Sequence, residues 1–268
     1  MKPFSADWLQ LREPYDRQAR NAVIIDQLVS AVSGLRPISI VDLGCGTGST
    51  FRALASRLPM PQHWLLVDND LGLLQRAAAL NARNGARITT RAIDLVRDLE
   101  AALDGAIDLV TASALLDLVS AEWLDRFVVE CAARRLPAYF ALTHDEIAVE
   151  PADAADAEII AAVYRHQQND KGFGPALGPR AAKTAIASFQ RAGYGVDSRR
   201  SDWELEARND DEMQDAVLHA WASAARDERS VPLGEIAAWL TRRRDLLAAG
   251  RSALRIGHVD LLALPAAS

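Results

Sequence analysis

A turn with three closely spaced glycines, residues 44–48, is the first feature of the sequence able to bring a ligand against the main chain. Glycine has no β-carbon, so a small molecule can approach the backbone amides of such a turn closely. Gly44 and Gly46 fit the beginning of the dinucleotide-binding pattern, but Ser49 stands where that pattern has its third glycine. The turn therefore predicts a nucleotide-like ligand without specifying a dinucleotide.

Three acidic residues lie at or near the ends of successive predicted strands. Asp42 precedes the first glycine by two residues, and Asp68 and Asp94 end the next two strands. These carboxylates would repel a pyrophosphate, and the turn contains no basic residue to offset them. S-adenosylmethionine has no phosphate, and its ammonium, ribose hydroxyl and adenine amino groups can donate hydrogen bonds to carboxylates. The acids therefore favour S-adenosylmethionine over NAD as the cofactor.

Strand and helix patterns alternate along the first half of the chain and would place the turn and the acids at strand ends. The periodicity predicts a helix over 15–33 and further helices after the glycine turn, as far as Leu58, and after the second strand, as far as Leu80. Apolar runs predict strands over 38–43, 64–68, 87–94, 107–113 and 139–145. Such alternation indicates βαβ units and a mainly parallel sheet with helices on both faces.

The second half of the chain is less regular. The pattern predicts helices over 155–168 and 181–189, two helices within 210–250, and strands over 196–205 and 255–264. The expected fold class is therefore α/β, with a doubly wound, mainly parallel, seven-stranded sheet. We expect one domain over 1–268, with an N-terminal helical segment (1–36), a cofactor-binding half (37–144) and helical cap insertions (145–180 and 210–250).

The composition excludes several classes of protein. The chain has 268 residues, half of them apolar, and no apolar stretch resembles a signal peptide or a membrane span. Cys45 and Cys131 are the only cysteines, so no disulfide framework and no cysteine-based metal motif is expected. The net charge of −6 disfavours a nucleic-acid partner. These features are typical of a cytoplasmic protein without a bound metal.

The segment Val41–Gly48 resembles the first motif of the class I S-adenosylmethionine-dependent methyltransferases at every position, and the order of strands and acids agrees over residues 20–265. The resemblance implies a Rossmann-like methyltransferase fold. It also implies that the amino-acid end of the cofactor lies at Asp42 and at the turn residues Gly44, Cys45, Gly46, Thr47 and Gly48.

The same resemblance assigns the rest of the cofactor. Asp68 would accept from the ribose hydroxyls, with Asn69 beside it, while Asp94 would accept from the adenine amino group. The amide of Leu95 would donate to the adenine ring. Ser113 and Ala114 would lie near the transferable methyl group.

The acceptor is less well specified, because an activated methyl donor chiefly requires alignment and exclusion of water. The segment 113–117 lacks the Asn/Asp-Pro-Pro-aromatic motif of enzymes that methylate nucleic-acid amino groups. Cys131 lies in a helical pattern without the preceding proline of cytosine-C5 enzymes, and it is expected in the core. A small-molecule acceptor is therefore expected. The sequence does not specify the oligomeric state of the protein.

The acceptor pocket is expected outside the carboxyl ends of the strands. His144 and Asp145 would border it at the end of the fifth strand, and His166 shares a helix face with Ile159 and Val163. A neutral imidazole can act as a general base, so His166 and then His144 are the candidate catalytic residues. The loop after His166 is a candidate lid, and its candidate substrate-binding residues are Asn169, Lys171 and Phe173.

The aromatic N-terminal segment Trp8–Asp16 is expected to fold over the cofactor, with Arg12 or Arg20 pairing with its carboxylate. Solvated arginines are an equal alternative, and Asp117 and Trp123 have no assigned role. Two other functions remain open at this point. One is an NAD-dependent oxidoreductase, and the other is a non-catalytic S-adenosylmethionine-binding regulator or partner subunit.

Overall fold

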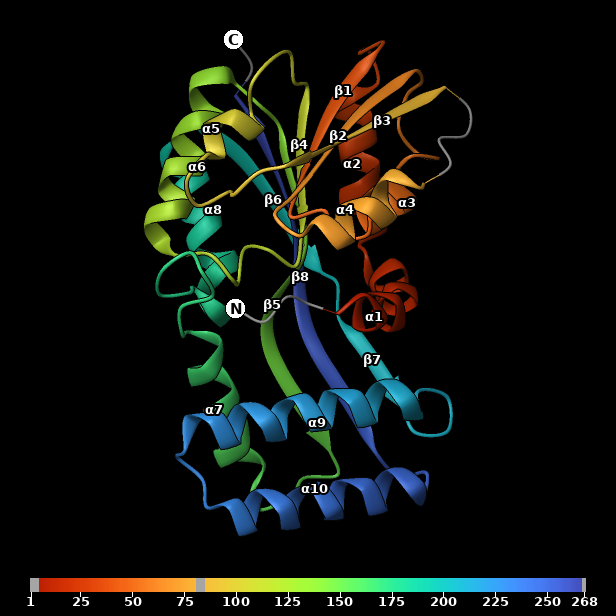
Figure 1. Ribbon diagram of the computed structural model, residues 1–268, viewed down its shortest axis with the longest axis vertical. Coiled ribbons are helices and arrows are strands. Elements are labelled where there is room, and N and C mark those ends of the chain that lie inside the picture. The colour runs from red at the N-terminus through yellow and green to blue at the C-terminus, as the bar shows by residue number, and fades with distance from the viewer. Residues whose placement is uncertain (1–4, 81–84, 267–268) are drawn as a thin grey trace.

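A computed structural model describes residues 5–80 and 85–266 of the chain (Figure 1). The strands are β1 (Ile38–Leu43), β2 (Gln62–Asp68), β3 (Ala86–Ala92), β4 (Leu109–Ser113), β5 (Ala138–Glu150), β6 (Tyr194–Arg200), β7 (Trp203–Glu206) and β8 (Ala253–Pro265). The helices are α1 (Ala6–Ala19), α2 (Ala22–Val32), α3 (Ser49–Leu54), α4 (Leu71–Ala78), α5 (Leu99–Ala102), α6 (Ala121–Arg134), α7 (Asp156–Gln167), α8 (Ala181–Arg191), α9 (Asp211–Glu228) and α10 (Leu233–Ala248), with a short 3-10 turn at Gly178–Arg180.

The strands described form one sheet in the order β3-β2-β1-β4-β5-β8-β6, and β7 pairs with β8 beside this path. Strands β1 to β5 pair in parallel, whereas β8 is antiparallel to its three neighbours. The predicted α/β fold is confirmed, with a sheet of eight strands where seven were expected. The eighth arises because the predicted strand 196–205 divides at Ser201–Asp202, where the Asp202 carboxylate accepts a hydrogen bond from the amide of His258 (2.9 Å).

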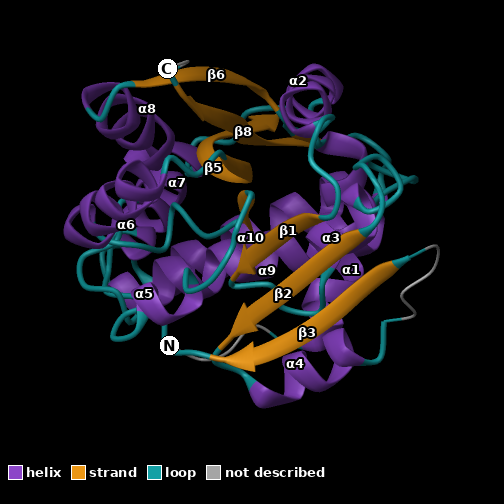
Figure 2. Ribbon diagram, turned by 90° about the horizontal axis from the view of Figure 1, so that it is seen from above, coloured by secondary structure: helices purple, strands orange, loops and turns teal. Residues whose placement is uncertain are grey.

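Helices cover both faces of the parallel part of the sheet (Figures 1 and 2). One core cluster joins the strands to α5, α6 and α8, and Cys131 lies in it, as expected. A second cluster joins the other face to α2, α3 and α4. Burial from both sides explains why four of the six residues of β1 are apolar.

The lower half of the molecule is built on a long ribbon of β5 and β8 (Figure 1). The pairing of these strands continues from Thr143↔Val259 to Glu150↔Ala253, well beyond the parallel strands. The helices α7, α9 and α10, which we call the cap helices, pack with β7 against this ribbon in a third core cluster. The prediction of a connection starting at residue 145 was therefore wrong, because residues 145–150 continue β5.

The N-terminal helical segment is interrupted where one helix over 15–33 was predicted. Helix α1 ends at Ala19, Arg20 is extended, and Asn21 caps α2 by accepting hydrogen bonds from the amides of Val23 (3.0 Å) and Ile24 (3.3 Å). The amide of Asn21 donates to the Asp260 carboxylate on β8 (2.9 Å). This cap and anchor turn the chain, so α1 can leave the sheet and lie over its carboxyl edge. Among the described residues, no helix is both long enough and apolar enough to span a bilayer.

Candidate active site

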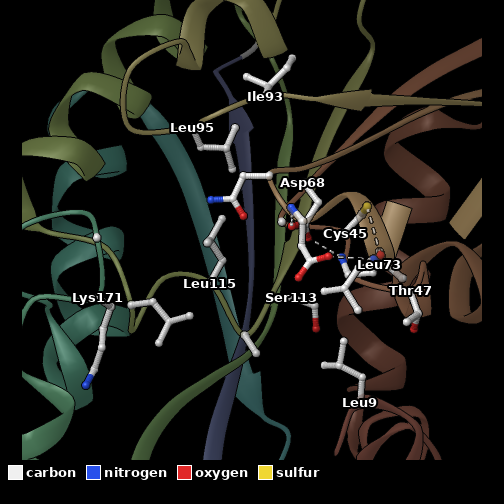
Figure 3. Close-up of a pocket in the computed structure, with 18 of the residues that line it drawn as sticks. Leu9, Cys45, Thr47, Asp68, Leu73, Ile93, Leu95, Ser113, Leu115 and Lys171 are labelled. Atoms are coloured by element: carbon white, nitrogen blue, oxygen red, sulfur yellow. Dashed lines mark hydrogen bonds between the residues drawn. The ribbon is translucent and has the colours of Figure 1, made fainter. Parts of the chain in front are cut away.

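A cavity of about 620 Å³ lies at the carboxyl ends of β1 to β4 (Figure 3). The chain turns in opposite directions after β1 and β4, and such a reversal in strand order opens a crevice in doubly wound sheets. Figure 3 shows Lys171 and Asp68 on opposite sides of the cavity. Leu9 of α1 borders the cavity below Ser113 in this view. The lining residues are Leu9, Arg12, Asp16, Gly44, Cys45, Gly46, Thr47, Ser49, Thr50, Asp68, Asn69, Asp70, Leu73, Ile93, Asp94, Leu95, Val96, Arg97, Ser113, Ala114, Leu115, Leu118, Lys171, Gly172 and Phe173.

The glycine turn forms one wall. Gly46 and Gly48 have positive φ values of 54° and 85°, a conformation that strains other residues. A β-carbon on Gly46 would lie 3.2 Å from Leu9 Cδ1, which shows how closely α1 covers the turn. Gly48 does not line the cavity, and a β-carbon there would lie 2.5 Å from Leu80 Cδ1. The structure therefore places Gly48 in packing and the preceding turn residues at the cavity.

Asp68 shapes this turn from the end of β2. Its Oδ2 accepts a hydrogen bond from the Gly46 amide (2.8 Å), and its Oδ1 accepts from the Asp70 amide (3.0 Å). Asn69 follows it on the cavity wall. Asp70, which the sequence analysis did not single out, caps α4 and also lines the cavity. A carboxylate N-cap directly before an apolar helix is a signal that was available in the sequence.

The far end of the cavity lies at Asp94 and Leu95. Asp94 Oδ1 accepts from the Val96 amide (2.9 Å), and the indole nitrogen of Trp123 donates to the Leu95 carbonyl (2.6 Å). The Phe173 ring stands edge-on to Trp123, with 5.5 Å between the ring centroids. Trp123, unassigned from the sequence, thus links the Leu95 backbone to the loop that carries Phe173.

Asp42 is fully buried beneath the turn and does not line the cavity. Thr111 Oγ1 donates a hydrogen bond to Asp42 Oδ1 (2.8 Å). Burial raises the pKa of Asp42 to about 7, although Thr111 and the charge of Arg20 oppose this shift. Asp42 was predicted at the amino-acid end of the cofactor, and from this position it would act there only through the turn or through water.

The two candidate arginines differ in their partners. Arg12 lines the cavity, donates two hydrogen bonds to Asp16 (2.8 and 3.0 Å), and lies 4.8 Å from the centroid of the Trp203 ring. Arg20 is buried, and its hydrogen-bond partners among the described residues are three hydroxyl groups and no carboxylate. Those hydroxyls belong to Ser113 (3.2 Å), Tyr139 (3.4 Å) and Thr50 (3.5 Å).

Arg20 thus keeps a buried positive charge directly behind two residues that line the cavity, Ser113 and Thr50. Its Nε has no hydrogen-bond partner among the described atoms. Buried guanidinium groups are usually paired with an anion. Arg20 itself does not line the cavity, and the charges of Asp260 and Asp16 already act on it, so a cofactor carboxylate would reach Arg20 only past Ser113 and Thr50.

The candidate acceptor residues are only partly brought together. Lys171 and Phe173 line the cavity, whereas His166, Asn169, His144 and Asp145 do not. His166 Nε2 lies 4.0 Å from Asp227 Oδ2 on α9, and Asn169 donates to Glu228 (2.6 Å). The predicted pocket-facing orientation of His166 was therefore wrong, because α7 packs against α9 and turns this side chain towards it.

Two further expectations change because β5 continues past the sheet edge. Asp145 accepts a hydrogen bond from Arg200 (2.6 Å) at the outer side of the ribbon, outside the cavity lining. His144 is buried in the ribbon, with Nδ1 3.1 Å from the Gly257 carbonyl oxygen. Its ring centroid is 5.7 Å from that of His258, a residue that the sequence analysis did not consider because it lies in an apolar strand.

Comparison with known proteins agrees with this geometry. Residues 40–136, which span β1 to α6, match the family model of the methyltransferase domain. Comparison with curated proteins gives no match. Solved structures with the same fold include a candidate methyltransferase from Bacillus halodurans C-125, at 12% identity and TM-score 0.52, with 90% of this chain and 99% of that chain covered.

Two other solved structures are similar at the level of the fold. A candidate type II methyltransferase from Anaeromyxobacter dehalogenans has 20% identity and TM-score 0.51, with 92% and 98% of the two chains covered. A cyclopropane-fatty-acyl-phospholipid synthase-like protein from Lactobacillus casei ATCC 334 has 14% identity and TM-score 0.52, with 97% and 94% covered.

The matched domain contains the glycine turn, the strand-end acids and the Ser113–Leu118 wall of the cavity. Residues 40–136 therefore form a methyltransferase domain.

Proposed function

We propose that this enzyme transfers the methyl group of S-adenosylmethionine to a small-molecule acceptor by in-line displacement. The observation that carries the proposal is the enclosure of the cavity. Helix α1 covers it with Leu9, Arg12 and Asp16, and the loop 171–173 closes the opposite side. A cavity bounded by two segments of the same chain suits a small acceptor better than an extended polymer.

Each part of the cofactor can be assigned to residues in or behind the wall of the cavity. The turn 44–47 and Arg20 would hold the amino-acid end, with Arg20 supplying the cation for the carboxylate. Asp68 would accept from the ribose hydroxyls beside Asn69, and Asp94 with the Leu95 amide would hold the adenine. The bound sulfonium supplies an already activated methyl group, which would then lie near Ser113 and Ala114.

Arg12 is the weaker candidate for the carboxylate, because it is already paired with Asp16. Among the candidate bases, His144 is favoured over His166, because it is buried near the cavity wall while His166 faces α9. Lys171 and Phe173 would border the acceptor as part of a lid, and Asn169 and Asp145 would act only through the elements that they join.

Transfer of labelled methyl groups tests the proposal. Purified enzyme is incubated with methyl-labelled S-adenosylmethionine and a cell extract divided into low-mass, protein and nucleic-acid fractions. We expect label in the low-mass fraction with the wild-type enzyme and none with Asp68→Ala. Label appearing instead in protein or nucleic acid would contradict the small-molecule proposal.

A further inference from the structure

Among the buried polar atoms without a hydrogen-bond partner in the described residues, four belong to side chains that lie close together behind the cavity lining, although none of these side chains lines the cavity itself. The four atoms are Asp117 Oδ1, His144 Nε2, Trp203 Nε1 and His258 Nδ1. Buried polar groups are nearly always paired, so a group of such atoms indicates a bound water or ligand. We call Asp117, His144, Trp203 and His258 the buried polar cluster.

The cluster is continuous with the wall of the cavity. Arg12 lines the cavity and lies 4.8 Å from the centroid of the Trp203 ring. Ring centroids then follow at 5.0 Å from Trp203 to His258 and at 5.7 Å from His258 to His144. Asp117 belongs to the loop whose Leu115 and Leu118 line the cavity. The cluster therefore lies along the ribbon on the α1 side of the cavity.

The hydrogen bond of His144 defines what its free nitrogen can do. A carbonyl oxygen can only accept, so the contact between His144 Nδ1 and the Gly257 carbonyl (3.1 Å) places the proton on Nδ1. Burial lowers the pKa of His144, so the ring is neutral and Nε2 keeps its lone pair. This nitrogen requires a hydrogen-bond donor.

The backbone holds this arrangement in place. The pairing of β5 and β8 shifts register between His144 and Glu146, a bulge of the kind that reorients side chains at sites. A β-carbon on Gly257 would lie 2.7 Å from Asp145 Oδ1 and closer still to Arg200 Nη2. A side chain at 257 would therefore have to displace the ends of the Asp145 and Arg200 side chains.

The surroundings disfavour an anionic acceptor. The guanidinium groups whose charges reach His144 are those of Arg12 and Arg200, and both are already paired with carboxylates. Burial raises the pKa of the neighbouring Asp117 carboxyl group, so this group brings no cation to the site either. Tyr164 adds another ring beside His144, at 6.3 Å between centroids, so the donor is expected on an aromatic molecule.

Resting on the proposed function, we propose that the acceptor is a hydroxylated aromatic compound whose hydroxyl donates to His144 Nε2. An aromatic hydroxyl has a pKa near ~10, as in tyrosine, and so gives up its proton to an imidazole more readily than an aliphatic alcohol. The O–C bond forms as the C–S bond of the sulfonium breaks, and the hydroxyl proton passes to Nε2. The products are the aryl methyl ether, the neutral thioether and a His144 imidazolium that releases its proton to solvent.

Binding of simple probes tests this assignment. Phenol, catechol and 1-naphthol are titrated into the enzyme saturated with S-adenosylhomocysteine, beside toluene and benzoate, and binding is followed by ligand-observed NMR. We expect at least one hydroxylated probe to bind and toluene and benzoate not to bind. His144→Phe, which keeps a ring, should weaken that probe about tenfold, whereas His219→Phe on the exposed face of α9 should not.

A second measurement needs no variant. Long-range ¹H–¹⁵N NMR of the wild-type imidazoles should show His144 Nε2 unprotonated and should show its resonance move with the hydroxylated probe only. Equal binding of toluene, unchanged probe affinity in His144→Phe, or an unmoved Nε2 resonance would overturn the inference. If the wild-type enzyme does not bind S-adenosylhomocysteine at all, the proposed function itself would be refuted.

Discussion

Arg20 and Asp68 illustrate how two charged residues serve different parts of one cavity. Asp68 already accepts two backbone hydrogen bonds and faces the cavity, so its position follows from the end of β2. Arg20 reaches the opposite region from the break between α1 and α2, and it meets hydroxyl groups only. The two residues should therefore affect different portions of a bound cofactor.

Arg20→Met tests the carboxylate assignment. The variant should bind S-adenosylhomocysteine on the order of tenfold to a hundredfold more weakly, because a charge-assisted pair contributes about 1.5–3 kcal/mol. Its affinity for 5′-methylthioadenosine, which lacks the amino-acid portion, should change less than about threefold. Calorimetry with both ligands measures this, and an equal loss for the two would show that Arg20 only supports the cavity.

Asp42 should make stability depend on pH. Its pKa rises from 3.8 to about 7 on burial, so the native state holds a proton that the unfolded state has lost between these values. The free energy of unfolding should therefore fall as pH rises through this range, by up to about 1.4 kcal/mol per pH unit. Asp42→Asn lacks this contribution.

Urea unfolding of both proteins at several pH values between about 4.5 and 8 measures the effect. The stability of the wild-type protein relative to Asp42→Asn should decrease as pH rises. A difference that stays constant across this range would show that Asp42 titrates alike in both states.

At the scale of elements, the sequence predicted most of what positions the cofactor. Strands β1, β2 and β4 are largely buried, β1 ends directly before Gly44 and β2 ends at Asp68, so the ends of these two strands are visible locally. The continuation of β5 was not predictable, because residues 143–150 are largely polar and become a strand only by pairing with β8. His144 was misplaced for that reason, since it was expected at a strand end, whereas His166 was misplaced because α7 packs against α9.

The loop 171–173 should affect both the cofactor and the acceptor. Its side chains Phe173 and Lys171 should have different effects on binding and turnover. Phe173 contacts Trp123, which holds the Leu95 carbonyl, so Phe173→Ala should weaken S-adenosylhomocysteine binding several-fold. Lys171 lines the cavity, but its Nζ donates to the His166 carbonyl (2.8 Å) and points away from Asp68 in Figure 3. Lys171→Ala should therefore lower turnover while cofactor affinity stays within about twofold. Calorimetry measures the S-adenosylhomocysteine affinity of the two variants, and initial rates measure their turnover. Equal changes of affinity and turnover in both variants would contradict separate roles for Phe173 and Lys171.

At the scale of the whole molecule, the cap helices are joined to the ribbon through a buried ion pair. Arg243 on α10 is fully buried, pairs with Asp156 at the start of α7, and donates to the Pro151 carbonyl (2.7 Å). Trp239 donates to the same carboxylate (2.8 Å). The cap was predicted as helical, but its attachment depends on these long-range partners, which no local pattern reveals.

Asp156→Ala should destabilise the protein by about 3–5 kcal/mol, because it leaves the Arg243 charge buried without a partner. The matched control is Asp26→Ala, which removes the partner of Arg57 in an ion pair exposed on both sides and should cost about 0–1 kcal/mol. Urea unfolding measures both free energies. A similar small loss in the two variants would show that the buried pair does not hold the cap.

The most direct test of the methyltransferase assignment is calorimetric titration with S-adenosylhomocysteine, with NAD in parallel. The wild-type protein should bind S-adenosylhomocysteine and not NAD. Asp68→Ala should lose about 2–4 kcal/mol of that affinity while keeping its circular dichroism spectrum. The exposed Asp104→Ala should match the wild type. Undiminished affinity in a folded Asp68→Ala variant, or tighter binding of NAD, would contradict the account.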